Sequence, residues 1–168
     1  MRIVKKVAAI AVSLAALTSL SGCVSLFGLF GSKTPHECMT RVMYFESNRS
    51  SPDGMLAVGT VVMNRANSHQ FPSDVCGVVG QKNQFADGVL SRQMTEQRSL
   101  NLAAQMATRV LRGERHPGVQ DAMYFHTAGL TFPYRNMHYV LVAGGNAFTR
   151  GAESIPERTC LTGCKTTR

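Results

Sequence analysis

The stretch "CMTRVMYFESNRSSPDGMLAVGTVVMNR", residues 38–65, holds two apolar helical patterns separated by a turn-forming sequence. Ser51-Pro52-Asp53-Gly54 supplies a cap residue and a proline suited to the first position of a second helix. That second pattern is apolar over much of its circumference, so we expect it to form a central helix. The stretch therefore predicts a helix-rich domain built on two consecutive helices.

One acidic residue, Glu46, lies on the apolar stripe of the first helix. It follows Met39 by seven residues, Val42 by four and Met43 by three, and each spacing places it on the core-facing side. One interpretation is a carboxylate at the core edge that pairs with Arg41, Arg49 or Arg65, or that reaches solvent.

The other interpretation of Glu46 is chemical. Apolar surroundings and the negative end of a helix both raise the pKa of a carboxyl group. A carboxyl group that stays protonated near neutral pH can donate a proton to a leaving oxygen, as cleavage of a glycosidic bond requires.

The remaining chain predicts short elements of both kinds. Helical periodicity and cap residues predict three helices and one helical turn, at residues 34–47, 53–66, 99–112 and 73–80. Apolar runs bounded by glycine predict three strands, at residues 122–127, 138–143 and 147–150. The expected fold class is α+β, mainly α, with a small antiparallel β element.

The N-terminus has the layout of a secretory signal. MRIVKK is basic, and the apolar run at residues 7–20 is short for a membrane-spanning helix. The run ends in Leu20-Ser21-Gly22-Cys23, which resembles a bacterial lipobox, whose cysteine is lipidated. A plain signal peptide and an uncleaved anchor are the alternatives.

These features predict the organisation of the chain. We expect a lipoprotein signal peptide over 1–22, a tether over 23–33, the folded domain over 34–150 and a tail over 151–168. By resemblance to sorted lipoproteins, Val24 in place of an aspartate favours the periplasmic face of the outer membrane. Loss of Arg2, Lys5 and Lys6 with the signal peptide would lower the net charge from +8 to +5, a moderate positive balance that suits an anionic surface or polymer. Export argues against nucleic acid.

Four of the five cysteines remain once Cys23 is set aside for lipid. An even number in an exported domain indicates disulfides, and four cysteines allow three pairings. We expect Cys38–Cys76 and Cys160–Cys164, with free buried thiols as the alternative.

Metal and thiol chemistry find less support in the sequence. His36-Glu37 begins a zinc-protease pattern, but Thr40 stands where the second histidine belongs. We therefore expect no metal and no cofactor. A nucleophilic Cys38 or Cys76 beside His126 would make a cysteine peptidase, although Glu37 would raise the pKa of the Cys38 thiol.

The ordered motifs resemble the SleB-type cell wall hydrolase domain, a family named for spore-cortex-lytic enzymes. Its opening hallmarks are matched by Tyr44, Glu46, Gly54, Asn64 and Arg65. Further motifs match Phe71-Pro72, Cys76-Gly77-Val78-Val79, Gln84-Phe85, Tyr124-Phe125-His126 and Gly145-Asn146-Ala147-Phe148. The resemblance covers roughly residues 37–150.

The resemblance implies a lysozyme-like fold that cleaves peptidoglycan between N-acetylmuramic acid and N-acetylglucosamine. It implies Glu46 as the catalytic residue. The residues expected to contact the glycan are Tyr44, Asn64, Gln84, Phe85, Tyr124, His126, Asn146 and Phe148. His126 could hydrogen-bond either the glycan or Glu46.

Three departures from the family pattern bear on mechanism and activity. Where the family often has Arg-Gly-Glu after the catalytic residue, this chain has Asn48-Arg49-Ser50, so a second acid is missing. Ala147 stands at a usual histidine, and a family tryptophan is replaced near Tyr134.

The missing acid favours a lytic transglycosylase over a two-carboxylate hydrolase, with Asp53 and Asp87 as the nearest other candidates. The alternatives are a wall-binding lipoprotein with weakened catalysis and the cysteine peptidase.

Overall fold

The computed structural model describes residues 32–47, 49, 51–132 and 137–152. The chain divides after Ser32, and every element belongs to the unit from Lys33 onward. The elements are α2 (Pro35–Glu46), α3 (Pro52–Ala66), α4 (Val75–Val79), α5 (Gln97–Leu111), β1 (Tyr124–Thr127), β2 (Met137–Ala143) and β3 (Asn146–Ala152). This confirms the α+β, mainly α class. Cys23, Cys160 and Cys164 lie outside the described residues.

Side-chain caps fix where the helices begin. The Thr34 hydroxyl accepts a hydrogen bond from the Glu37 amide at 3.1 Å, and the Ser51 hydroxyl accepts one from the Gly54 amide at 3.0 Å. A proline occupies the first helical position after each cap, and the one at Pro52 was predicted from the sequence. The α5 helix begins at Gln97, earlier than the predicted start at residue 99, because Glu96 caps it.

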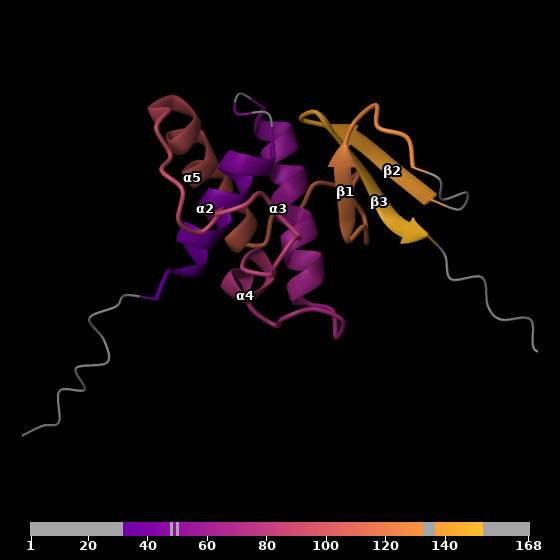
Figure 1. The fold of residues 1–168 in the computed structure, drawn as a ribbon, viewed down its shortest axis with the longest axis horizontal. Coiled ribbons are helices and arrows are strands. Elements are labelled where there is room, and N and C mark those ends of the chain that lie inside the picture. Colours follow the sequence, from indigo (N-terminus) through magenta and orange to yellow (C-terminus); the bar gives the residue numbers. More distant parts are fainter. Residues whose placement is uncertain (1–31, 48, 50, 133–136, 153–168) are drawn as a thin grey trace, which may run out of the picture. The chain divides into compact units, whose positions relative to one another are not determined.

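The central helix is α3, which packs against α2 and α5 on one side and contacts β2 on the other. Figure 1 shows α3 between the remaining helices and the sheet. Its residues Met55, Val58, Val61 and Val62 are fully buried. The prediction of a central second helix is therefore confirmed.

The sheet has three antiparallel strands in the order β1-β3-β2. A two-residue turn at Gly144 (φ 56°) and Gly145 (φ 85°) joins β2 to β3 and pairs Ala143 with Asn146. Positive φ at both turn positions matches the twist of a hairpin and suits glycine. The observed β3 is longer than the predicted strand at residues 147–150. The observed β1 is shorter than predicted, since it begins at Tyr124 and not at residue 122.

The hairpin turn lies directly against the first turn of α3. A Cβ atom built on Gly54 would come within 2.4 Å of the Cα atom of Gly144. Two glycines are therefore needed for this backbone approach, which brings the start of β3 toward the end of α2.

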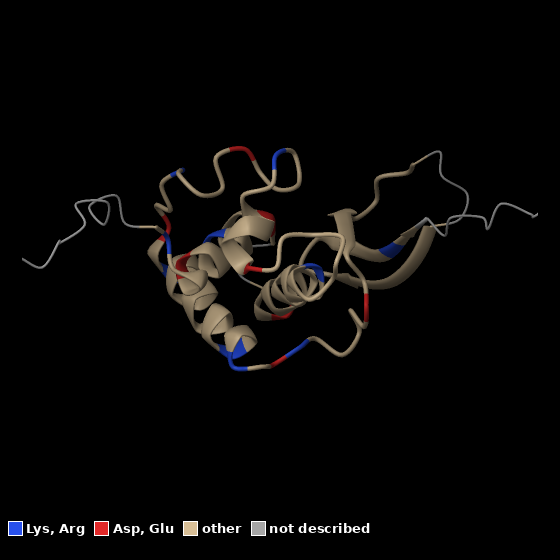
Figure 2. Cartoon of the chain, turned by 90° about the horizontal axis from the view of Figure 1, so that it is seen from below, with Lys and Arg blue, Asp and Glu red and all other residues tan. Residues whose placement is uncertain are grey.

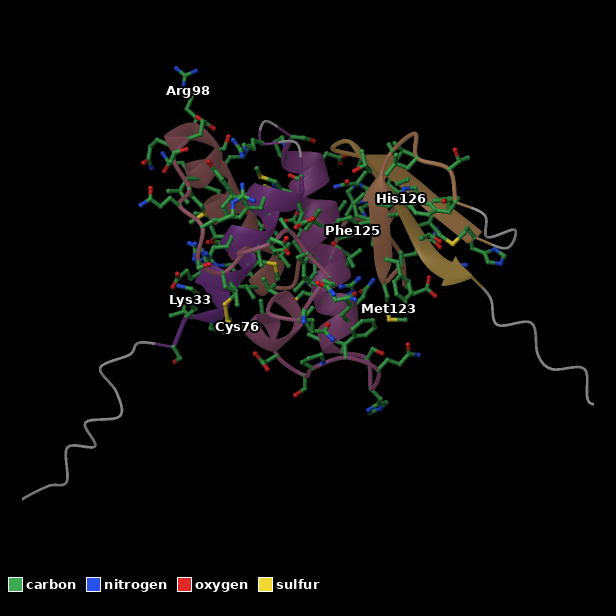
Figure 3. The ribbon with its side chains drawn as sticks, viewed as in Figure 1. Lys33, Cys76, Arg98, Met123, Phe125 and His126 are labelled. Carbon is green, nitrogen blue, oxygen red and sulfur yellow. A yellow bond between two sulfur atoms is a disulfide. The ribbon has the colours of Figure 1, made fainter. Side chains whose placement is uncertain are left out.

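A disulfide between Cys38 and Cys76 ties α2 to α4, as predicted. Cys38 is fully buried, and Figure 3 labels Cys76 beside the start of α2. The bond closes a loop that contains α3, so it restricts the unfolded chain over much of the helical part.

We expect Gly54→Ala to lower the free energy of unfolding by about 1–3 kcal/mol, because the added methyl group meets the Gly144 backbone, which has no rotamer to change. Urea denaturation measures the loss. Gln105→Ala on the exposed face of α5 is the control and should change stability by less than about 0.5 kcal/mol. Equal stability of both variants would contradict the close contact.

Replacing both Cys38 and Cys76 by alanine should destabilise the domain by about 2–4 kcal/mol, since the loop between them then gains freedom when unfolded. The denaturation midpoint of the double variant, compared with that of the oxidised wild type, tests this. An unchanged midpoint would show that the bond is absent from the folded protein.

Candidate active site

Glu46 is the last residue of α2 and lines a pocket of about 410 Å³. This Glu46 pocket is lined by Phe45, Glu46, Asn83, Gln84, Phe85, Phe125, His126, Thr127, Leu130 and Asn146. One wall comes from the irregular segment after α4, and the other comes from β1, the turn that follows it and the start of β3. Residues far apart in the sequence thus converge on one half-buried carboxyl group.

Two hydrogen bonds hold the end of α2 between these walls. The Ala86 amide donates to Oε1 of Glu46. The Asn146 side-chain amide donates to the main-chain oxygen of Glu46 at 2.7 Å. That oxygen belongs to the last turn of a helix, where carbonyls have no intrahelical partner. Asn146 therefore anchors β3 to the C-terminal end of α2.

Burial raises the pKa of Glu46 above its ordinary value of 4.5. The Ala86 hydrogen bond and the positive charge of Arg65 lower it in part, but the net direction remains upward. A raised pKa is the property that a carboxyl group needs in order to donate a proton near neutral pH.

Two of the three arginines considered as partners of Glu46 are engaged elsewhere in the described part of the chain. Arg41 donates to the main-chain oxygens of Val89 and Arg92. Arg49 lies over the Tyr44 ring, 4.8 Å from its centroid. No ion pair between described residues includes Glu46. The structural interpretation of Glu46 as a paired carboxylate is therefore wrong.

Four of the residues predicted to contact the glycan line the Glu46 pocket, namely Gln84, Phe85, His126 and Asn146. The ring nitrogens of His126 contact the Thr127 main-chain oxygen and the Tyr139 hydroxyl, both at 2.8 Å. No hydrogen bond joins His126 to Glu46 among the described contacts, so that expected pairing is not observed. Figure 3 places Phe125 and His126 on different sides of β1.

The other four predicted contact residues are not among those that line the Glu46 pocket. Two of them, Tyr44 and Phe148, are buried, so these two assignments are wrong. Tyr44 is 1% exposed, and its hydroxyl accepts a hydrogen bond from the Glu96 amide at 3.0 Å. Phe148 is fully buried against Phe125.

Asn64 and Tyr124 also lie outside the pocket lining, but both are accessible, so their contact with the glycan stays a prediction. The Asn64 amide donates to the main-chain oxygens of Gln120 and Ala122 and so holds the segment before β1. Tyr124 packs on Phe71, is 37% exposed and is not among the residues that line the pocket.

Sequence reasoning missed five lining residues, Phe45, Asn83, Phe125, Thr127 and Leu130. Phe45 and Phe125 adjoin residues that it did identify, whereas the loop positions carried no distinct signal. Neither candidate second acid reaches the pocket, since Asp53 pairs with His116 at 2.9 Å and Asp87 is not among the lining residues. Glu46 is the sole carboxylate in this lining.

Thiol chemistry at the two described cysteines is excluded. Cys38 and Cys76 form a disulfide, so neither is the nucleophile of a cysteine peptidase, and the hypothesis that used them is wrong. Over the described ranges, no cluster of three His, Cys, Asp or Glu side chains could hold a metal ion. No helix in the same ranges is long and apolar enough to cross a membrane.

Charged residues are distributed around the helices and loops, with basic and acidic positions interspersed (Figure 2). The strands carry few of them, and Arg150 on β3 pairs with Asp121. The side of the pocket formed by the sheet and the turn after β1 therefore carries no Lys, Arg, Asp or Glu among its lining residues.

The family model described as Cell Wall Hydrolase matches residues 49–149. The chain belongs to the cell wall hydrolase family. The match begins just after Glu46 and takes in both walls of the pocket. Membership makes the protein an enzyme that acts on the bacterial cell wall, which confirms the predicted class. No curated protein matches this cell wall hydrolase.

Two solved structures resemble the enzyme. One is the catalytic domain of the germination-specific lytic transglycosylase SleB from Bacillus anthracis, at 25% identity and a TM-score of 0.56, covering 71% of this chain and 97% of that one. The other is the catalytic domain of the SleB protein from Bacillus cereus, at 20% identity and a TM-score of 0.53, covering 71% and 98%. The similarity confirms the expected lysozyme-like α+β fold.

The raised pKa of Glu46 implies that this residue lowers the free energy of unfolding at neutral pH. A carboxyl group whose folded pKa exceeds its unfolded value stabilises the fold at acid pH, and this contribution is lost as pH rises through the folded pKa. We therefore expect Glu46→Gln to raise the melting temperature by a few degrees at neutral pH, since a neutral amide retains the acceptor for Ala86. The difference should shrink below about pH 4, where both states protonate the acid.

Thermal unfolding of wild type and Glu46→Gln across this pH range measures the effect. Glu114→Gln, at a half-buried position, is a control that should not follow the same trend, because the hydrogen bond from Arg109 lowers the pKa of Glu114. A constant difference between Glu46→Gln and wild type at all pH values would contradict the assigned direction.

Proposed function

We propose that the enzyme is a lytic transglycosylase that cleaves the glycan strand of peptidoglycan between N-acetylmuramic acid and N-acetylglucosamine. The observation that carries the proposal is a half-buried carboxyl group with a raised pKa and no second carboxylate in its pocket. The Bacillus anthracis relative, which bears the name lytic transglycosylase, supports the same reaction class.

Glu46 acts first as a general acid and then as a general base. In its neutral form it donates its proton to the glycosidic oxygen, and the bond from that oxygen to the anomeric carbon breaks. The resulting carboxylate takes the proton from the 6-hydroxyl group of the same muramic acid. The 6-oxygen then bonds to the anomeric carbon and gives a 1,6-anhydro product, with Glu46 protonated again.

The pocket lining supports this assignment. Oε1 of Glu46 accepts from Ala86, which leaves Oε2 available for the substrate. Phe45 and Phe85 offer apolar surface to sugar rings, while Gln84 and Asn83 offer side-chain amides to hydroxyl and N-acetyl groups. Water is not a reactant in the anhydro route, so no second acid is required to activate it.

We also propose that the enzyme is exported and held at the envelope by lipid on Cys23, with its catalytic domain at residues 34–150. The basic and apolar leader that ends in Leu-Ser-Gly-Cys supports this anchor. The expected location is the periplasmic face of the outer membrane. The intact mass of protein extracted from the membrane fraction tests the lipid.

Purified Glu46→Gln should release muropeptides from sacculi at a rate about 10² to 10⁴ times lower than that of wild type, because the amide cannot transfer a proton. Dye-labelled sacculi give the rate, and mass spectra of the soluble products give their type. Anhydro-muropeptides support the proposed reaction, whereas reducing ends would make the enzyme a hydrolase. Equal rates for both proteins would falsify the role of Glu46.

A matched control separates catalysis from folding. Gln105→Ala lies on the exposed face of α5 and should leave the rate unchanged. If wild type binds sacculi in a pull-down but releases no product, the alternative of a wall-binding lipoprotein is favoured. Ala147, which replaces a usual family histidine and pairs with His126 across the strands, motivates that alternative.

A further inference from the structure

Arg65, near the end of α3, carries a charge that is almost wholly buried, with the residue 4% exposed. Its Nε donates to the Met123 main-chain oxygen at 2.7 Å. The guanidinium carbon lies 5.0, 5.1 and 5.7 Å from the ring centroids of Phe71, Phe85 and Tyr124. These three rings form an aromatic cage around the cation, in the distance range of cation–π attraction.

The aromatic cage connects both walls of the Glu46 pocket. Phe85 lines the pocket and directly precedes Ala86, whose amide donates to Glu46. Tyr124 begins β1 and directly precedes Phe125 and His126 in the opposite wall. One side chain of α3 therefore contacts the segments that set the width of the pocket.

The cation of Arg65 also acts on the acid. Its charge lowers the pKa of Glu46, and Glu46 in turn favours the charged form of Arg65. The two side chains nevertheless form no ion pair, and Nη1 of Arg65 is buried without a hydrogen-bond partner among the described residues. Ring stacking and the bond to Met123 hold the guanidinium in place.

The lack of an ion pair between Arg65 and Glu46 suits the proposed role of Glu46, which first donates a proton and then accepts one. A direct ion pair would favour the ionised form of Glu46 and oppose the proton donation. A wholly apolar surrounding would oppose the carboxylate that forms afterwards. The groups that face the pair are His126 from β1 in the pocket and Tyr124 from β1 against Arg65.

We propose that Arg65 is a positioning residue whose cation the aromatic cage holds near Glu46 but out of ion-pair contact, so that Glu46 can serve as acid and then as base. The proposal rests on the function proposed above. A guanidinium buried solely for stability would gain more from a complete set of hydrogen bonds than from an unpartnered Nη1.

The test compares pH profiles of kcat/KM on soluble glycan strands for wild type, Arg65→Met, Arg65→Lys and Phe71→Ala. Because the free enzyme needs protonated Glu46, kcat/KM should fall as pH rises through the pKa of that group. This falling part of the profile is the alkaline limb. On it, a displacement of the profile by one pH unit changes kcat/KM at a given pH by about tenfold.

Arg65→Met keeps most of the side-chain volume but removes the charge, so its alkaline limb should move to higher pH. Arg65→Lys keeps a cation without the planar stacking, so its limb should not rise, although kcat should fall. Phe71→Ala leaves the pocket lining intact and opens the cage, which frees Arg65 to pair with Glu46. Its limb should therefore move to lower pH, opposite to that of Arg65→Met.

Val110→Ala is the control, since Val110 is fully buried in α5 and is not among the pocket residues. It should lower the melting temperature without moving the limb. If all variants lose stability and kcat while every limb stays in place, Arg65 is purely structural and the inference is overturned. If Arg65→Met does not fold, the shift of Phe71→Ala decides alone.

Failure of the underlying function gives a different result. If Glu46 is not the acid, Glu46→Gln retains the wild-type rate whatever the Arg65 variants do. If Glu46 is the acid but Arg65 does not act on it, Glu46→Gln is inactive, and the limb is present in wild type and unmoved in the variants.

Discussion

The backbone contact between Gly54 and Gly144 is the constraint on which the site depends. At 2.4 Å from a hypothetical Cβ, it admits no side chain on either residue. It brings the β2–β3 turn onto the first turn of α3, and Asn146 then reaches the main-chain oxygen of Glu46. Without this approach, the sheet would still form its ladder, but β1 and β3 would not face the end of α2. The pocket is thus a consequence of packing a hairpin against a helix start.

The same arrangement explains how the Glu46 carboxyl group is accommodated in largely apolar surroundings. Glu46 ends its helix, so its main chain meets the sheet while its carboxyl group meets the loop at Ala86. Burial raises its pKa, yet one amide hydrogen bond and one nearby cation limit the rise. A fold that paired the Glu46 carboxylate fully with a cation would be more stable, but its carboxyl group would donate a proton less readily. This conflict between stability and activity is usual at catalytic groups. The disulfide at the other end of α2 contributes stability where no chemistry is expected.

The sequence predicted the elements well because their signals are local. Caps at Thr34 and Ser51, glycines at the hairpin turn and helical spacing around Glu46 each act within a few residues. The start of α5 was missed because Glu96 is a less common cap than serine or threonine. The Cys38–Cys76 pairing followed from parity and an expected exported setting, without any knowledge of geometry.

The site was predicted less completely, since pocket lining depends on which side of an element faces which neighbour. Four aromatic residues of the family motifs were assigned to the glycan, but Tyr44 and Phe148 are buried and Tyr124 contacts Arg65 instead of lining the pocket. A motif records that a residue type is needed, and it does not distinguish contact with substrate from support of a residue that makes the contact. Here the support is itself ordered around a charge: Phe71, Phe85 and Tyr124 surround Arg65, and Phe85 alone of the three also faces the pocket. Phe85 and Tyr124, which the sequence assigned to the glycan, therefore pack around the buried Arg65. The charge of Arg65 in turn lowers the pKa of Glu46.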